Sequence, residues 1–202
     1  MASGYSATFP VTAITSVSPA VATVGAGHGA IVGTVMEMTS GWSALNNKVV
    51  RVSAVSVNDL TLDSYDASSL TTYPTGVGVG SMREITGWTQ IPQILGSAFS
   101  GGDQNFFEYQ YLESDSKVKI PTVKNAAELK LTIADDPTLA GIILAGVANN
   151  DRAQRSIKVQ LANGGLLYYT AYVSLRTTPS LTINVAMEVE ITLAFLNVPV
   201  RY

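Results

Sequence analysis

Apolar and polar residues alternate along most of the chain, and a period of two residues is typical of β-strands. The longest alternating run is Thr182–Leu196, in which every second residue from Ile183 to Phe195 is apolar. Glu188 and Glu190 lie on the opposite face of this run. Because a strand usually has about five or six residues, we expect this one to bend between two sheets or to cross a contact between subunits.

Shorter runs with the same alternation predict further strands. Asn163–Gly164–Gly165 stands between two of them and is a clear hairpin signal. Ile94–Asp103 lacks the pattern, and we interpret it as a loop. The alternating runs are Val11–Val17, Ala30–Met38, Lys48–Ser56, Asp59–Leu62, Glu84–Ile91, Asn105–Leu112, Glu128–Ile133, Ile157–Leu161 and Leu166–Leu175.

One segment has the pattern of an α-helix, which the sequence predicts over residues 136–149. Asp135 or Asp136 would cap its first amides, and Pro137 suits the first helical position. Its two uncharged faces differ in size, and we expect one to pack on the protein's own sheet and the smaller one on another body, such as a second subunit. The larger face holds Leu139, Ile142, Ile143 and Val147, and the smaller face holds Ala140, Gly141, Leu144, Ala145 and Ala148.

The chain divides into two regions that differ in composition and in the length of the predicted strands. Residues 1–82 are rich in Ser, Thr, Val, Ala and Gly and predict a small all-β module. The module ends in the Gly-rich connector Thr75–Gly80, and we place the boundary near Met82. Residues 83–202 contain the longer strands and the helix.

The composition is apolar for a chain without a membrane-spanning run: 47% of residues are hydrophobic, 13% are charged and the mean hydropathy is +0.25. Such a surface is expected for a protein that is covered mostly by copies of itself. The net charge of −3 argues against a surface that grips nucleic acid. The first 36 residues carry no charge, so no basic signal-peptide region is present and we expect synthesis in a cytoplasm.

Candidate catalytic and metal-binding chemistry is sparse. The chain has one histidine, His28, and no cysteine, which leaves no Ser-His-Asp triad, multi-histidine metal site or thiolate site. His28 is interpreted as a turn residue, and Asp135–Asp136 as helix caps rather than metal ligands. Glu188 and Glu190 suit a solvated face or the wall of an aqueous channel better than an acid–base pair. The sequence therefore predicts no enzyme, no cofactor and no metal.

Glu113–Asn125 is the most charged segment of the chain and contains Pro121, which favours an exposed loop. In a chain with so little charge, we interpret this loop as an assembly contact, with a merely solvated loop as the alternative. The candidate residues are Glu113, Asp115, Lys117, Lys119 and Lys124.

Several segments between Met82 and Tyr202 together resemble the major tail tube proteins of long-tailed bacteriophages. In chain order they are REITGWTQIP, AFSGGDQNF, KIPTVKNAAEL, DDPTLAGI, LANGGLLYYTAYVS and VPVRY. Upstream, residues 26–73 are similar to a small β module that recurs in phage structural proteins, although they lack its common polar insertion after Gly27–His28–Gly29.

The resemblance implies a mainly β (α+β) fold, with two packed antiparallel sheets flanked by one helix and a long loop. It implies rings of about six subunits that join their sheets into a barrel and stack into a tube. DNA would pass through the lumen without specific binding, and the partners would be tape-measure, tail-terminator and tail-tip proteins. The protein would belong to the virion tail and be assembled in the host cytoplasm.

Two site assignments follow from this resemblance. Basic residues on the wall of the lumen would bind phosphate, so Glu188 and Glu190 are the candidate lumen-facing residues. Glu113–Asn125 would reach the next ring and become ordered only on stacking. The alternative function is a virion-surface decoration or adhesin-like binding module that displays residues 1–82, and a third, disfavoured reading is a small hydrolase with a carboxylate pair.

Overall fold

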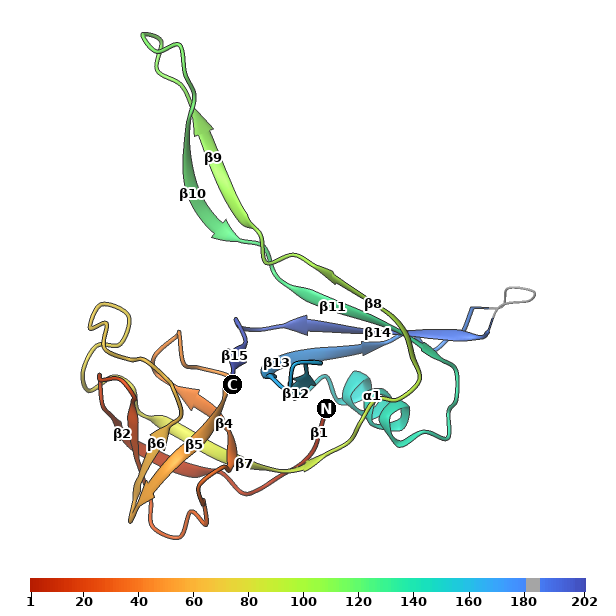
Figure 1. Cartoon of the computed structure of the whole chain (residues 1–202), viewed down its shortest axis with the longest axis horizontal. Coiled ribbons are helices and arrows are strands. Elements are labelled where there is room, and N and C mark those ends of the chain that lie inside the picture. Colours follow the sequence, from red (N-terminus) through yellow and green to blue (C-terminus); the bar gives the residue numbers. More distant parts are fainter. Residues whose placement is uncertain (181–185) are drawn as a thin grey trace.

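The computed structural model describes residues 1–180 and 186–202, and these form a mainly β protein with antiparallel sheets and one helix, as predicted (Figure 1). No helix among them has the length and apolar character that crossing a membrane requires. The elements are β1 (Ala2–Tyr5), β2 (Phe9–Ile14), β3 (Val21–Val24), β4 (Val35–Ser40), β5 (Lys48–Ser56), β6 (Asp59–Leu62), β7 (Gly80–Trp88), β8 (Ile94–Ser100), β9 (Gln104–Tyr109), β10 (Val118–Lys124), β11 (Glu128–Ala134), α1 (Ala140–Asp151), β12 (Arg155–Gln160), β13 (Leu166–Leu175), β14 (Glu188–Phe195) and β15 (Val200–Arg201).

The N-terminal strands close into a small barrel in the order β7-β2-β3-β6-β5-β4, because β7 pairs with β2 on one side and with β4 on the other. Gly80 permits this closure, since a Cβ there would lie 1.9 Å from the Thr39 carbonyl oxygen. Closure leaves the barrel without an open edge that could aggregate. Its largest fully buried side chains are Met36, Met38, Trp42, Leu45, Leu60, Leu62 and Met82.

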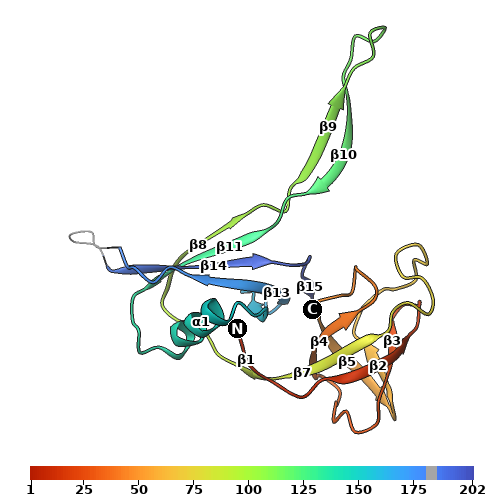
Figure 2. The same cartoon turned by 180° about the vertical axis from the view of Figure 1, so that it is seen from behind.

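The second sheet has the order β12-β13-β14-β11-β8, with β15 pairing β13, and α1 covers one of its faces (Figures 1 and 2). Leu131 pairs with Ile191 and Ile133 pairs with Val189, so the apolar residues of β11 and β14 share the face under α1. The alternation predicted from the sequence is thus confirmed in both strands, whose buried and partly exposed residues alternate.

Helix α1 begins later than predicted, at Ala140, with Leu139 at the N-cap and no capping side chain. Asp136 instead closes the preceding turn: its Oδ1 accepts hydrogen bonds from the Thr138 amide at 3.0 Å and the Thr138 hydroxyl at 2.6 Å. These bonds hold the pKa of Asp136 below its usual range. The helix runs to Asp151, and Arg152 follows in the left-handed conformation.

The packing of α1 also differs from the prediction. The helix packs on the sheet mainly through small residues of its smaller face, whereas Ile143 and Val147 of the larger face are 54% and 50% exposed. Small side chains let the helix axis approach the sheet closely, which the size of the apolar residues did not indicate. The buried helix residues are Gly141, Ile142, Ala145 and Ala148.

Three further segments differ from their predictions. Ile94–Ser100 is not a loop but strand β8, paired with β11. Within the described residues the long strand ending near Leu196 begins at Glu188, and residues 182–185 of that prediction lie outside the described residues. Glu113–Asn125 is exposed as expected, but its second half, Val118–Lys124, is strand β10.

Strands β9 and β10 form a two-stranded ribbon, here called the arm (residues 103–125), which projects away from the rest of the protein (Figures 1 and 2). The arm continues the β8–β11 hairpin beyond a kink at Gly101–Gly102. Every residue of β10 is exposed.

The barrel contacts the second sheet through a mixed core and through hydrogen bonds. The predicted boundary at Met82 falls inside β7, whose later residues pair with β1, so the division into two domains stays a prediction. Val49 and Ile85 from the barrel side pack with Ala2 and Tyr168. Asn197 Nδ2 also donates hydrogen bonds to the carbonyls of the Asn46–Asn47 turn at 2.8 and 2.9 Å.

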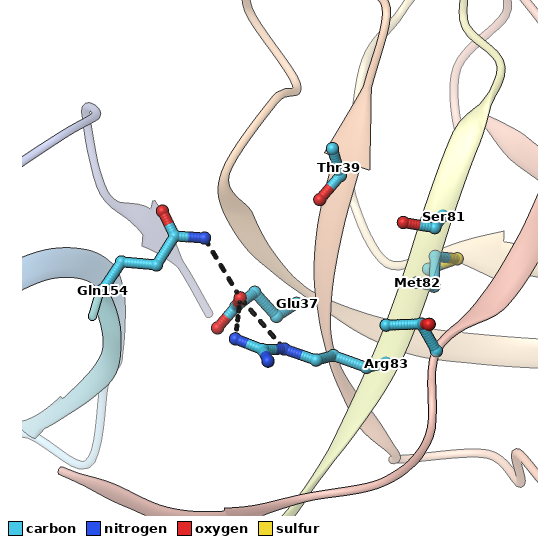
Figure 3. A pocket seen from close by; sticks show the side chains of 7 residues that line it. Glu37, Thr39, Ser81, Met82, Arg83 and Gln154 are labelled. Carbon is cyan, nitrogen blue, oxygen red and sulfur yellow. Dashed lines mark hydrogen bonds and ion pairs between the residues drawn. The ribbon is translucent and has the colours of Figure 1, made fainter. Parts of the chain in front are cut away.

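A buried carboxylate lies at this junction (Figure 3). Glu37 on β4 is 4% exposed; its Oε1 accepts from Arg83 Nη2 at 2.5 Å, and its Oε2 accepts from the Ser156 hydroxyl on β12 at 2.6 Å. Gln154 approaches from the side of the second sheet, with Nε2 3.4 Å from Oε1. Arg83 also stacks 3.9 Å above the Tyr5 ring. The network therefore ties the barrel to the sheet through directional bonds.

Replacing Glu37 with alanine should destabilise the protein by about 3 kcal/mol, because Arg83 and Ser156 lose their partner in a buried site. The matched control is Asp63→Asn, which removes the more exposed ion pair with Arg51 and should cost about 1 kcal/mol or less. Urea unfolding of both variants measures the difference. Equal losses of unfolding free energy in the two variants would show that the Glu37 network contributes no more to stability than the Arg51–Asp63 ion pair.

Candidate assembly surfaces

The face of the second sheet opposite α1 is polar over β11 and β14. Glu188, Glu190 and Thr192 lie on this face because they pair with Ala134, Thr132 and Lys130 respectively. Both glutamates are partly exposed, as the alternation predicts. The face is called the open face below, and it consists of Glu128, Lys130, Thr132, Ala134, Glu188, Glu190, Thr192 and Ala194.

The open face carries both acidic and basic residues, and its net charge is weakly negative. Glu128 lies beside Lys130, with an Oε1–Nζ distance of 3.8 Å. Arg176 follows β13, and its backbone N–H donates to the Glu190 carbonyl. The surface therefore has little fixed charge with which to hold phosphate.

The arm has one apolar and one mixed face. Ile120 pairs with Phe107 and Val118 pairs with Tyr109, so these four side chains share one face, here called the aromatic face. The rings of Phe107 and Tyr109 stack with centroids 6.3 Å apart, and Tyr111 meets Tyr109 edge-on at 5.2 Å.

The five charged residues predicted in this segment are spread along the arm. Lys119 lies on the mixed face, where its Nζ is 2.8 Å from Glu108 Oε1, and this bond raises the pKa of Lys119. Glu113, Asp115 and Lys117 lie in the turn at the tip. Lys124 lies at the base, opposite Gln104. The sequence thus located the charges, and the alternation of Asn105–Leu112 put Phe107, Tyr109 and Tyr111 on one side of a strand. It did not indicate that Val118 and Ile120 of β10 complete this face.

The direction of the arm depends on Gly101. Its φ is 77°, and a Cβ at this position would lie 1.9 Å from the Ala126 carbonyl oxygen on the opposite chain segment. Gly102 follows with φ 81° and donates its N–H to the Asn125 carbonyl at 3.2 Å. The kink between the β8–β11 and β9–β10 parts of the hairpin therefore requires glycine.

Strand β8 is an edge of the second sheet. Among the described residues it pairs only with β11, and Ile94, Leu95 and Phe99 are exposed. An exposed apolar edge strand is a template for pairing with another chain. This edge could not be predicted from the local pattern, because β8 is exposed on both faces and does not alternate.

The groups considered for chemistry have structural contacts. His28 Nδ1 accepts the Ala30 amide at 3.1 Å, which leaves Nε2 as the donor to the Val57 carbonyl at 2.9 Å. The polar pocket beside Glu37 measures about 190 Å³, and the carboxylate in it is already bonded to Arg83 and Ser156. Across residues 1–180 and 186–202, no three acidic or histidine side chains lie close enough together to hold a metal ion.

The structure presents an open sheet face, an exposed edge strand and a projecting arm. Residues 40–202 match the family described as phage tail tube protein, TTP, and the chain therefore belongs to the phage tail tube protein family. This family is a structural one, and membership identifies the chain as a component of the virion tail. Comparison with curated proteins gives no match.

Replacing Gly101 with alanine should change the direction of the arm, since alanine would meet the Ala126 carbonyl. Spin labels on Asp115→Cys at the tip and Leu70→Cys on the barrel, in this cysteine-free chain, report the distance. The control is Gly164→Ala, which has a similar φ of 85° but nothing within 4 Å of its Cβ. We expect a shifted distance distribution for Gly101→Ala alone; unchanged distances in both variants would refute the requirement for glycine.

Proposed function

We propose that this protein self-assembles into stacked rings, of about six subunits each, that form the tail tube through which the phage genome reaches the host. The observation that carries the proposal is the continuous exposed hairpin of β8 and the arm, which offers both an open strand edge and a long apolar ribbon. An isolated two-stranded ribbon is marginally stable in water, so a partner surface is needed to cover it.

Within a ring, pairing at the β8 edge would join the second sheets of neighbouring subunits and remove the exposed edge. Between rings, the arm would contact the next ring, with Glu113, Asp115, Lys117, Lys119 and Lys124 at or near that contact. Tape-measure, tail-terminator and tail-tip proteins are the further partners, and assembly would take place in the host cytoplasm.

In this arrangement the open face lines the lumen, with Glu188 and Glu190 on its wall. Support comes from its weakly acidic, uncovered character, because a sliding DNA needs a wall that does not bind phosphate.

A second candidate function is display of the barrel on the outer surface of the tube, as a decoration or adhesin-like module. The observation that favours it is the exposed aliphatic tip of the β5–β6 turn, where Val57 is 86% exposed at a φ of 52°. This role is compatible with tube formation, since the barrel has a core of its own.

Shortening the arm should leave a folded chain that cannot form tubes. Replacing Gln110–Lys117 with Asn-Gly would close the Tyr109–Val118 pair with a two-residue turn. Negative-stain electron microscopy of concentrated protein should show hollow tubes or stacked rings for the unmodified chain and neither for the variant. Thermal unfolding serves as the control and should be nearly unchanged, because the arm strands contact chiefly each other. Normal tubes from the shortened chain would refute the role of the arm.

Replacing Glu188 and Glu190 with lysine should make assembled tubes retain a short fluorescent DNA duplex at low salt and release it at high salt. The matched control is Asp59→Lys/Asp66→Lys, which makes the same change of charge at exposed barrel residues. The lumen assignment predicts that DNA held by the glutamate variant is protected from an added nuclease and that DNA held by the control is digested. Equal digestion would place Glu188 and Glu190 outside the lumen.

A further inference from the structure

A groove of about 680 Å³ lies on the α1 side of the second sheet, in the part that the helix leaves uncovered. Its apolar lining includes Ile91, Ile94, Leu129, Leu131, Val159 and Leu193. Pockets of roughly 300–1,000 Å³ with an apolar lining are the size that binds several side chains or a small molecule. The groove is therefore large enough to receive part of another chain.

Lys158 is the charged residue in the lining of this groove. Its Nζ lies 5.3 Å from the centre of the Trp88 ring, near one end of the apolar lining. The other polar lining residues are Thr89, Gln90, Ser97 and Gln160. An occupant would thus be apolar along most of its length, with hydrogen-bonding groups and a negative charge at its border.

The aromatic face of the arm is mostly apolar and has hydrogen-bonding and negatively charged groups near one end. Phe107 is 60% exposed and Ile120 is 46% exposed, on an arm whose strands pair only with each other in the described residues. Tyr109 and Tyr111 provide hydroxyl groups, and Glu113 follows at the tip, without an ion pair among the described residues. The tip also carries Asp115 and Lys117, so its net charge with Glu113 is −1. The arm and the groove are therefore complementary in polarity, and the weakly acidic tip suits Lys158.

The arm cannot reach the groove of its own chain in this conformation. The groove is floored by residues on the α1 side of the sheet, whereas the arm rises on the other side (Figures 1 and 2). A contact that joins two different surfaces repeats from copy to copy, and it builds a ring if the rotation closes and an open stack if it does not. Surfaces on opposite sides of the subunit favour the open stack.

From this complementarity and placement we infer that the aromatic face of the arm docks into the groove of a second copy of the chain. The inference rests on the proposed tube function and adds the receptor surface to it. Phe107 and Ile120 would enter the apolar part of the groove, and the acidic tip would lie toward Lys158. Docking would cover both the exposed ribbon and the exposed groove.

Disulfide cross-linking between two single-cysteine chains tests the contact, since the chain has no cysteine of its own. Phe107→Cys on the aromatic face is mixed with Val159→Cys in the groove, the mixture is concentrated, and mild oxidant is added. We expect at least tenfold more cross-linked heterodimer on a non-reducing gel than with Glu108→Cys, a control on the mixed face. Ile120→Cys replaces Phe107→Cys if the latter does not fold, because the two residues are paired.

The outcomes separate this inference from the proposed function. Tubes or stacked rings without preferential cross-linking to Val159→Cys would overturn the docking site and retain the tube. Preferential cross-linking to Ile143→Cys would likewise overturn it and place the arm on the exposed face of α1. A chain that forms neither assemblies nor cross-links at any soluble concentration would count against both.

Discussion

The register between β11 and β14 is the constraint on which the other features depend. It places Leu131 beside Ile191 and Thr132 beside Glu190, so that one face of the sheet is apolar and the other polar. A slip of one residue would move every side chain of a strand to the opposite face, expose the core under α1 and bury the glutamates. The same two strands also define where the groove and the open face lie. Burial of the α1 face therefore fixes the position of every surface proposed for assembly.

Alternation predicted β5, β6 and β13 with the observed bounds. In β6 one face is buried and the other more exposed, whereas β5 and β13 bury residues on both faces in part of their length. Alternation failed for β8, whose position depends on pairing with β11 and not on burial of its own side chains. Pro121 suggested a loop, yet it lies in β10 opposite Phe106, at the edge of a two-stranded ribbon where a missing N–H costs little. Non-local pairing is thus what the local pattern could not supply.

The candidate residues illustrate the same limit. Glu188 and Glu190 could be assigned to one face from their spacing alone, and the structure places them on a face that α1 does not cover. Phe107, Tyr109 and Tyr111 could likewise be put on one side of a strand from their spacing, whereas the pairing of Phe107 with Ile120 across the turn could not be predicted. The helix faces were assigned by side-chain size, whereas close packing selected the small residues Ala145 and Ala148 in the core and Gly141 against the segment of residues 90–92. Sequence therefore predicts faces within a strand better than contacts between elements.

The exposed apolar surfaces account for the low proportion of charged residues in the chain. Exposed apolar residues lie on loops of the barrel, for example Val57 and Leu70, and on three further surfaces, which are the arm, the β8 edge and the outer face of α1. An isolated monomer leaves all three in water, and each would favour association with a different partner surface. The buried Glu37 network has the opposite effect, because its directional bonds hold the barrel in one orientation on the sheet. In a repeating assembly every subunit must present the same contact surfaces. A barrel held in one orientation on the sheet meets this requirement, since any variation in its orientation would be repeated along the whole stack.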